Sequence, residues 1–444
     1  MSDRTHRLTI ADVNERISGV VLDFPKPKVW FIGFAASFAV LMLLLVAIIW
    51  LFTKGVGIWG INIPIAWAFA ITNFVWWIGI GHAGTFISAI LFLLFQKWRT
   101  TINRFTEAMT LFAVACAGLF PLLHLGRPIY FYWLLPYPDT MGLWPQFRSP
   151  LVWDVFAVST YGTVSLLFWY VGLLPDFATL RDRAQRIWVR RVYGILSWGW
   201  SGAGRTWKHY EKAYVILAGL ATPLVVSVHS IVGMDFAVAM LPGWHSTIFP
   251  PYFVGGAIFC GFAMVLTLVI PMRKLYHLED FITLRHLELM AIVLMVTGWI
   301  VTYGYFSEFF TAWWSGDVFE RYAQVNRALG PYKGSFWAMV FCNCLAPQVL
   351  WSRRMRRCVP VLFAIGLIVN VGMWLERYVI IVESLHRDFL PSSWGMFHAT
   401  FWDWATFVGT IGLFLTLIFL FVRFIPAIAM AELRRQVAQP GEAS

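Results

Sequence analysis

Cysteine is scarce in this sequence, and the few residues present lack the spacing of a metal or cluster site. No C-x-x-C pair and no C-x-x-C-H haem attachment occurs among Cys116, Cys260, Cys342, Cys344 and Cys358. Iron–sulfur clusters need several cysteine ligands at defined spacings. We therefore expect no iron–sulfur cluster and no intrinsic haem in this chain.

Charge is also scarce, which excludes an ordinary soluble domain. Only 13% of the 444 residues are charged, whereas soluble domains carry roughly a quarter. Hydrophobic residues make up 59% of the chain and the mean hydropathy is +0.68. These values predict an all-α, polytopic membrane protein.

Apolar runs long enough to cross a bilayer recur along the chain. Ten membrane-spanning helices are predicted, at 30–52, 64–95, 105–125, 150–174, 213–240, 252–271, 287–314, 335–351, 359–384 and 401–425. Most of the 34 Lys and Arg residues fall in the segments that lie on the same side as both termini. Because basic residues accumulate in cytoplasmic loops, both termini are predicted to be cytoplasmic in a bacterial cytoplasmic membrane.

The chain is interpreted as one membrane domain. Residues 1–28 are predicted to be a cytoplasmic segment without a secretory signal, 29–425 the transmembrane domain, and 426–444 a cytoplasmic tail. Within the domain, 64–240 and 252–384 are candidate four-helix bundles with an extra helix before and after them. The net charge of +11 is attributed to this topology and to membrane lipid, not to nucleic acid.

Three titratable residues fall near the outer ends of three predicted spans. At about 1.5 Å per residue, His124, Asp154 and Asp235 lie within roughly 3–10 Å of those ends. The helix dipole alone could explain a histidine in a last turn and an aspartate near a first turn. It disfavours Asp235, which approaches the carboxyl end of its helix among apolar neighbours. Asp235 therefore needs a stabilising partner or a function.

Aromatic and basic residues at the same depth could form a pocket. Arg127, Tyr130 and Trp153 are the candidates, although an interfacial aromatic belt would place the rings there as well. A flat apolar ring with two hydroxyl groups suits such a pocket, because histidine and carboxylates can bind and accept the hydroxyl protons. The pattern thus favours a quinol.

Other ionisable groups in or beside the spans leave alternatives open. His82 and His229 could ligate a b-type haem, but a histidine hydrogen-bonded to a neighbouring helix is the more ordinary interpretation. A candidate proton path comprises His82, Glu308, Glu376, Arg377 and Asp403. The adjacent Glu376 and Arg377 could equally form structural ion pairs.

Four segments resemble one family of membrane proteins. They are GINIPIAW at 60–67, ITNFVWWIGIGHAGT at 71–85, HLGRP at 124–128 and SPLVWDVFAVSTY at 149–161. These segments closely resemble the NrfD/PsrC-like (polysulfide reductase-like) integral membrane subunits. The ten predicted spans favour, within that family, the ActC-type subunit of bacterial alternative complex III.

This resemblance implies an oxidoreductase subunit that is not active alone. Menaquinol would be oxidised near the periplasmic face, with His124, Asp154 and Asp235 as the quinol-binding residues. Electrons would pass to an iron–sulfur subunit and then to haem c subunits, with a sibling NrfD-like membrane subunit alongside and proton translocation as a possible coupling. The ActF-type sibling shares the fold without an established quinol role.

Two interpretations of another class stay open. A secondary transporter would have a broken helix pair near the midplane, and a structural anchor would have no cavity beside the three residues. The quinone type, the terminal acceptor and the number and kinds of partner subunits cannot be read from the sequence.

Overall fold

The computed structural model describes residues 9–135 and 148–438, and within these ranges the chain is helical without strands. Nine of the described helices are long and apolar enough to cross a membrane. They are α2 (Pro27–Lys54), α3 (Phe69–Thr85, continued by η2 Phe86–Ile90 and α4 Leu91–Leu93), α5 (Asn103–His124), α6 (Pro150–Arg183), α8 (Gly204–Ala237), α9 (Phe249–Leu275), α10 (Leu284–Ser315), α14 (Val359–Tyr378, continued by η7 Val379–Glu383) and α15 (Phe401–Phe424). The predicted fold class is confirmed.

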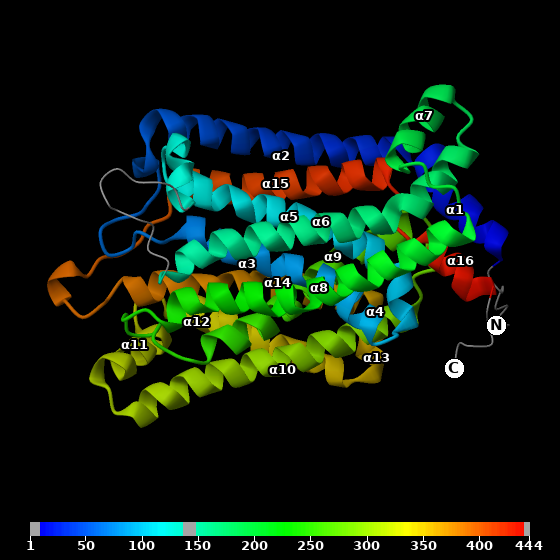
Figure 1. Ribbon diagram of the computed structural model, residues 1–444. Helices are drawn as coiled ribbons and strands as arrows, with labels where there is room; N and C mark the ends of the chain where they lie inside the picture. Colours follow the sequence, from blue (N-terminus) through cyan, green and yellow to red (C-terminus); the bar gives the residue numbers. More distant parts are fainter. Residues whose placement is uncertain (1–8, 136–147, 439–444) are drawn as a thin grey trace.

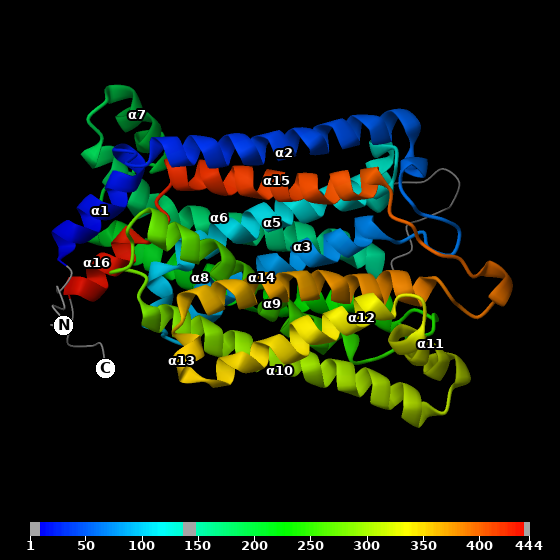
Figure 2. The same cartoon turned by 180° about the vertical axis from the view of Figure 1, so that it is seen from behind.

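The tenth predicted span, 335–351, is helical but interrupted. It consists of α12 (Lys333–Val340), the π-helical turn η5 (Phe341–Leu345) and the 3-10 helix η6 (Ala346–Trp351). Pro347 lacks a backbone N–H and cannot continue regular α-helical hydrogen bonding. Figure 2 shows this segment running along α10 from the end near α11 to the end near α13.

Shorter helices connect the long ones. They are α1 (Ile10–Leu22), η1 (Val56–Ile58), η3 (Lys97–Thr101), η4 (Pro128–Leu134), α7 (Ile187–Leu196), α11 (Val318–Leu329), α13 (Arg353–Arg356), η8 (Pro391–Ser393) and α16 (Met430–Ala438). Helices α1 and α16 contact each other at one end of the bundle (Figure 1). We call this end the terminal end and the opposite one the distal end.

Some predicted spans differ from the helix ends. Residues 64–68 precede the first turn of α3, so the span predicted at 64–95 begins only at Phe69. The spans predicted at 150–174 and 213–240 lie in longer helices, because α6 continues to Arg183 and α8 already begins at Gly204. Both helices thus extend beyond their apolar windows at the terminal end.

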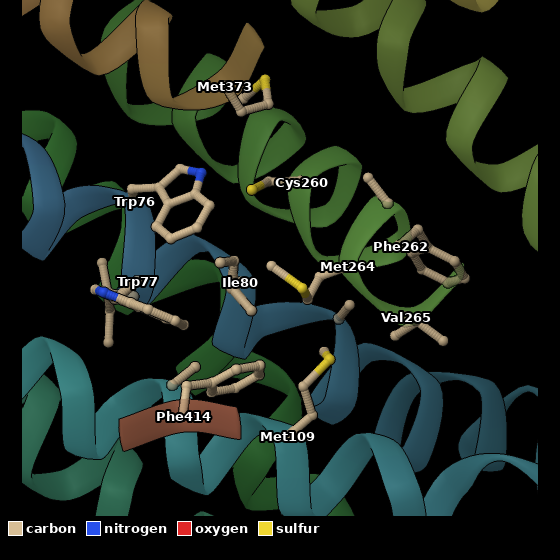
Figure 3. Close-up of a cluster of buried hydrophobic side chains, with 14 of the residues drawn as sticks. Trp76, Trp77, Ile80, Met109, Cys260, Phe262, Met264, Val265, Met373 and Phe414 are labelled. Carbon is tan, nitrogen blue, oxygen red and sulfur yellow. The ribbon is translucent and has the colours of Figure 1, made fainter. Parts of the chain in front are cut away.

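Helix α3 lies at the centre of the bundle. It packs against α5, α9 and α14, and 89% of its apolar window is buried, compared with 17% for α2. Figure 3 shows the side chains that fill the space around it, among them Trp77, Met109 and Phe262. Helices α2 and α15 pack against each other along one edge (Figure 1). The division into bundles 64–240 and 252–384 stays a prediction, since α9 contacts helices of both groups.

Small residues allow the close approach of α3 to α5. A Cβ atom at Gly84 would lie 2.0 Å from the carbonyl oxygen of Thr106. We expect Gly84→Ala to destabilise the protein by about 1–3 kcal/mol, the usual cost of overpacking. Gly219→Ala is the control, because a Cβ there meets nothing within 4 Å. Thermal unfolding in detergent measures both, and an unchanged midpoint for Gly84→Ala would contradict the tight packing.

Candidate functional site

The ends of three helices bring the three predicted site residues to the distal end of the bundle. His124 is the last residue of α5, Asp154 lies four residues after the start of α6 at Pro150, and Asp235 lies two residues before the end of α8. Helices α5 and α8 end at the distal end, where α6 begins (Figure 1). The predicted common depth of these residues follows from this arrangement.

Asp154 and Asp235 contact each other directly. Their carboxyl groups lie close enough to interact electrostatically and to share a hydrogen bond if one of them carries a proton, because two carboxylates hold only acceptors. Asp154 is 7% exposed, and among the described residues Oδ1 of each aspartate is buried without a hydrogen-bond partner. With one proton between them, such a pair has one carboxylate left to accept a proton. Asp235 lies at a helix end that disfavours its charge and therefore needs a partner. Asp154 is that neighbouring residue.

His124 adds a third unsatisfied polar group at the same end. Its side chain is half-buried, and its Nδ1 is buried without a partner. In the part of the chain that the structure describes, no hydrogen bond or ion pair joins His124 to either aspartate. His124 lies at the end of α5, which packs against α6, the helix that carries Asp154.

The three predicted pocket residues lie on the elements that flank this site. Arg127 is exposed and directly precedes η4, which carries Tyr130, while Trp153 directly precedes Asp154 on α6. The Tyr130 ring lies 6.5 Å from that of Tyr132. These positions agree with a shared pocket wall and equally with an interfacial belt. Which of them faces a ligand stays a prediction.

His82 and His229 form a second group, deep in the bundle. Both are fully buried, and His229 Nδ1 lies 3.1 Å from His82 Nε2. His82 Nδ1 also contacts the carbonyl oxygen of Ile78 at 2.7 Å. An iron ligated by both residues would have to lie between the two rings, and their direct contact leaves no space for it. The hydrogen-bonded interpretation describes this pair.

A buried ion pair lies next to the histidines. Arg377 pairs with Glu376, and both are almost fully buried. Arg377 interacts electrostatically with His229. On its other side Glu376 accepts a hydrogen bond from Tyr305, whose hydroxyl receives one from Asn343 Nδ2 at 2.8 Å. Sequence reasoning missed Tyr305 and Asn343, because side-chain contacts between helices leave no spacing pattern.

A second buried ion pair continues this group toward the distal end. Glu308 pairs with Arg327 of α11 and accepts a hydrogen bond from Gln324 at 3.2 Å. Glu308 also lines a cavity of about 310 Å³, which reaches Glu320 on α11. Burial raises the pKa of the Glu320 carboxyl, while the Gly243 N–H and the Arg327 guanidinium oppose this shift. The cavity offers a polar route between Glu308 and the distal end.

Asp403 is separate from these groups. It accepts hydrogen bonds from the backbone N–H groups of Gly60 and Thr400, both at 2.8 Å, in a capping box at the start of α15. These hydrogen bonds give Asp403 a structural role, because they cap the start of α15. The sequence carried the signal, because Thr400 followed three residues later by an acid just before an apolar run is typical of a capping box.

Glu383 is a functional candidate that the sequence analysis did not name. It is 2% exposed, ends the π-helical turn η7, and both of its carboxyl oxygens are buried without a partner. Arg327 interacts with it electrostatically. An acid inside the span predicted at 359–384 was the available signal. Buried acids of this kind are usually functional.

Comparison with known proteins decides the family. Residues 59–387 match the family described as "Polysulphide reductase, NrfD". The chain belongs to the NrfD family. The matched range contains the Glu376–Arg377 and Glu308–Arg327 pairs, the aspartate pair, and the histidines His82, His124 and His229, and it leaves out α2 and α15.

A curated relative agrees with this assignment. A candidate membrane subunit of the dimethyl sulfoxide reductase of Halobacterium salinarum is 29% identical over 217 residues, or 48% of this chain. The alignment spans 44% of that protein's length, less than half. The family and the relative agree in describing a membrane protein of the NrfD type. In residues 9–135 and 148–438, no group of three or more His, Cys, Asp or Glu side chains could hold a metal ion.

Proposed function

We propose that this NrfD-type subunit binds and oxidises a quinol at the distal end of the bundle. The observation that supports the proposal most strongly is the contact between the carboxyl groups of Asp154 and Asp235, each of which has a buried oxygen without a hydrogen-bond partner among the described residues. A reductase needs an electron donor, and a quinol in the membrane can supply electrons to a membrane subunit. The quinol is menaquinol in this proposal, as in the ActC-type subunits that the sequence resembles.

The residues divide the work of removing two protons and two electrons. The carboxylate of the aspartate pair accepts the proton of one quinol hydroxyl, and His124 Nδ1 hydrogen-bonds the other hydroxyl and accepts its proton. Both electrons leave to an iron–sulfur subunit docked at the distal end, from where haem c subunits carry them onward. The product is the quinone.

Topology supports a periplasmic location for this chemistry. The basic residues concentrate at the terminal end, which the positive-inside rule assigns to the cytoplasm. The distal end is then periplasmic, and protons released from the quinol leave on that side. The proposed complex also includes a sibling NrfD-like membrane subunit.

A test on His124 separates the quinol function from the topology. We expect His124→Gln in the assembled complex to lower kcat/KM for menaquinol by about 10²-fold or more, because a proton acceptor is lost. His398→Gln, an exposed histidine at the same end, should leave turnover unchanged. Wild-type kcat/KM for His124→Gln would favour an ActF-type sibling, a transporter or a structural anchor.

A proton path is a second proposed function, supported by a separate observation. His82, His229, the Glu376–Arg377 pair and the Glu308–Arg327 pair form a series of buried polar groups that ends at the distal cavity. A small space lined by Tyr305, Glu308, Arg327 and Glu376 lies between the two ion pairs. The series could couple quinol oxidation to proton translocation. Asp403 has no part in it.

A further inference from the structure

A cavity of about 470 Å³ opens at the terminal end, far from the quinol site. Three elements that are remote in sequence enclose it: the segment from Phe92 to Thr100, which includes η3; the first turns of α8; and α16. Figure 1 shows α4, which carries Phe92, beside α16 at this end. Its polar lining residues include Lys97, Arg99, Tyr210, Glu211, Glu432 and Arg435.

Two polar side chains that line this cavity each have a buried atom without a partner among the described residues. Arg99 is 5% exposed and donates to Glu432 from Nη2 at 2.6 Å, but in this part of the chain its Nη1 makes no hydrogen bond. Tyr210 is 8% exposed, and its hydroxyl group likewise has no partner in residues 9–135 and 148–438. Because buried polar groups are normally satisfied, a ligand with hydrogen-bond acceptors would complement these two donors.

The charges of the lining favour an anion. Glu432 is already held by Arg99 and by Arg104, at 2.6 and 3.3 Å, and Glu211 by Arg435 at 2.7 Å. Although burial raises the pKa of Glu432, the Arg99 and Arg104 guanidiniums outweigh this effect and lower it.

Lys97 is the basic residue of the lining whose charge no acidic lining residue neutralises. Its side chain is exposed and joins no ion pair among residues 9–135 and 148–438. The lining therefore carries an excess of positive charge.

The cavity also lies at the boundary between polar and apolar surface. On α8, Glu211 and Lys212 are exposed and charged, whereas Val215 and Ile216, one turn later, are 48% and 62% exposed and apolar. Phe95, which lines the cavity, is 90% exposed. Such a transition is expected where a helix passes from the headgroup region into the hydrocarbon.

We infer that this cavity binds the phosphate group of an anionic phospholipid, with Lys97, Arg99 and Arg435 facing the phosphate and the acyl chains passing over Phe95 and Val215. Arg99 is desolvated and held in place by Glu432, while Lys97 and Arg435 supply charge from the surface. The lipid would connect α16 to η3 and α8. The inference is independent of the proposed quinol function, because it concerns the opposite end of the bundle.

The test measures lipid binding to the delipidated full-length chain in neutral detergent. Phosphatidylglycerol is compared with phosphatidylcholine of the same acyl chains and with inorganic phosphate, by native mass spectrometry and by the thermal unfolding midpoint. We expect phosphatidylglycerol to be retained and to raise the midpoint more than phosphatidylcholine does. Equal effects of the two lipids would overturn the inference. A shift with inorganic phosphate but none with phosphatidylglycerol would indicate a free-anion site and would also overturn it.

Charge variants locate the binding site. If each surface basic residue contributes independently, Lys97→Gln with Arg435→Gln should raise the half-saturating phosphatidylglycerol concentration by about thirtyfold. Arg190→Gln with Arg191→Gln is the matched control, because it removes two exposed basic residues of α7 that are not among the residues lining the cavity. Its effect should stay below about twofold. Equal losses in both pairs would mean attraction to general surface charge and would refute the site.

Discussion

Replacing Asp235 by Asn is expected to lower quinol oxidation in the assembled complex by about 10²-fold or more, because a proton acceptor is lost while the volume is kept. Asp154→Asn should have an effect of similar size. The two carboxyl groups interact with each other. After either substitution one of them is an amide, so the pair no longer combines a carboxylic acid with a carboxylate. Steady-state menaquinol oxidation measures both variants.

The double variant gives the sharper result. Residues that act as a unit show strongly non-additive effects, so Asp154→Asn with Asp235→Asn should be little slower than the slower single variant. If the rate loss of the double variant equals the product of the two single losses, the aspartates act independently. Asp182→Asn, an aspartate of α6 at the terminal end with a 63% exposed side chain, is the control for assembly and should keep the wild-type rate. Near-wild-type rates in all variants would remove the aspartate pair from the mechanism.

Apolar runs were sufficient to predict most of the fold. A span such as α2 is recognisable because lipid demands an unbroken apolar surface, and only 17% of its window is buried by protein. The length of the apolar run was less informative for residues 335–351, where a π-helical turn and Pro347 interrupt the helix. Nor did it indicate that α6 continues through Pro175 to Arg183, beyond the span predicted at 150–174. Helix ends outside the hydrocarbon are set by local contacts that hydropathy does not measure.

The candidate site was predictable in part. The unfavourable position of Asp235 at a helix carboxyl end indicated a missing partner, and the common depth placed Asp154 near it. Contacts across helices were not predictable, because they depend on the rotation of each helix about its axis. Arg327 and Tyr305 are of this kind: each reaches a buried glutamate on another helix. Their charge or hydroxyl group alone does not distinguish them from residues on a solvated face.

Glu376→Gln is expected to destabilise the protein by about 3–5 kcal/mol, the usual cost of leaving one partner of a buried ion pair uncompensated. Arg377 would keep its charge in a position that is 1% exposed, and its Nε and Nη2 atoms already lack hydrogen-bond partners. Loss of the exposed partner of Arg181 in Asp182→Asn should cost less than about 1 kcal/mol. Thermal or denaturant unfolding in detergent compares the two variants.

A second substitution separates the structural role of the pair from proton transfer. Glu376→Gln with Arg377→Met removes both charges, so it should recover most of the lost stability, because an apolar replacement of a buried pair is often neutral. If Glu376 relays protons toward Glu308, the double variant should still oxidise quinol but should lose proton translocation in proteoliposomes. A double variant that is stable and still translocates protons at the wild-type ratio would make Glu376 and Arg377 a structural pair and would exclude them from the path.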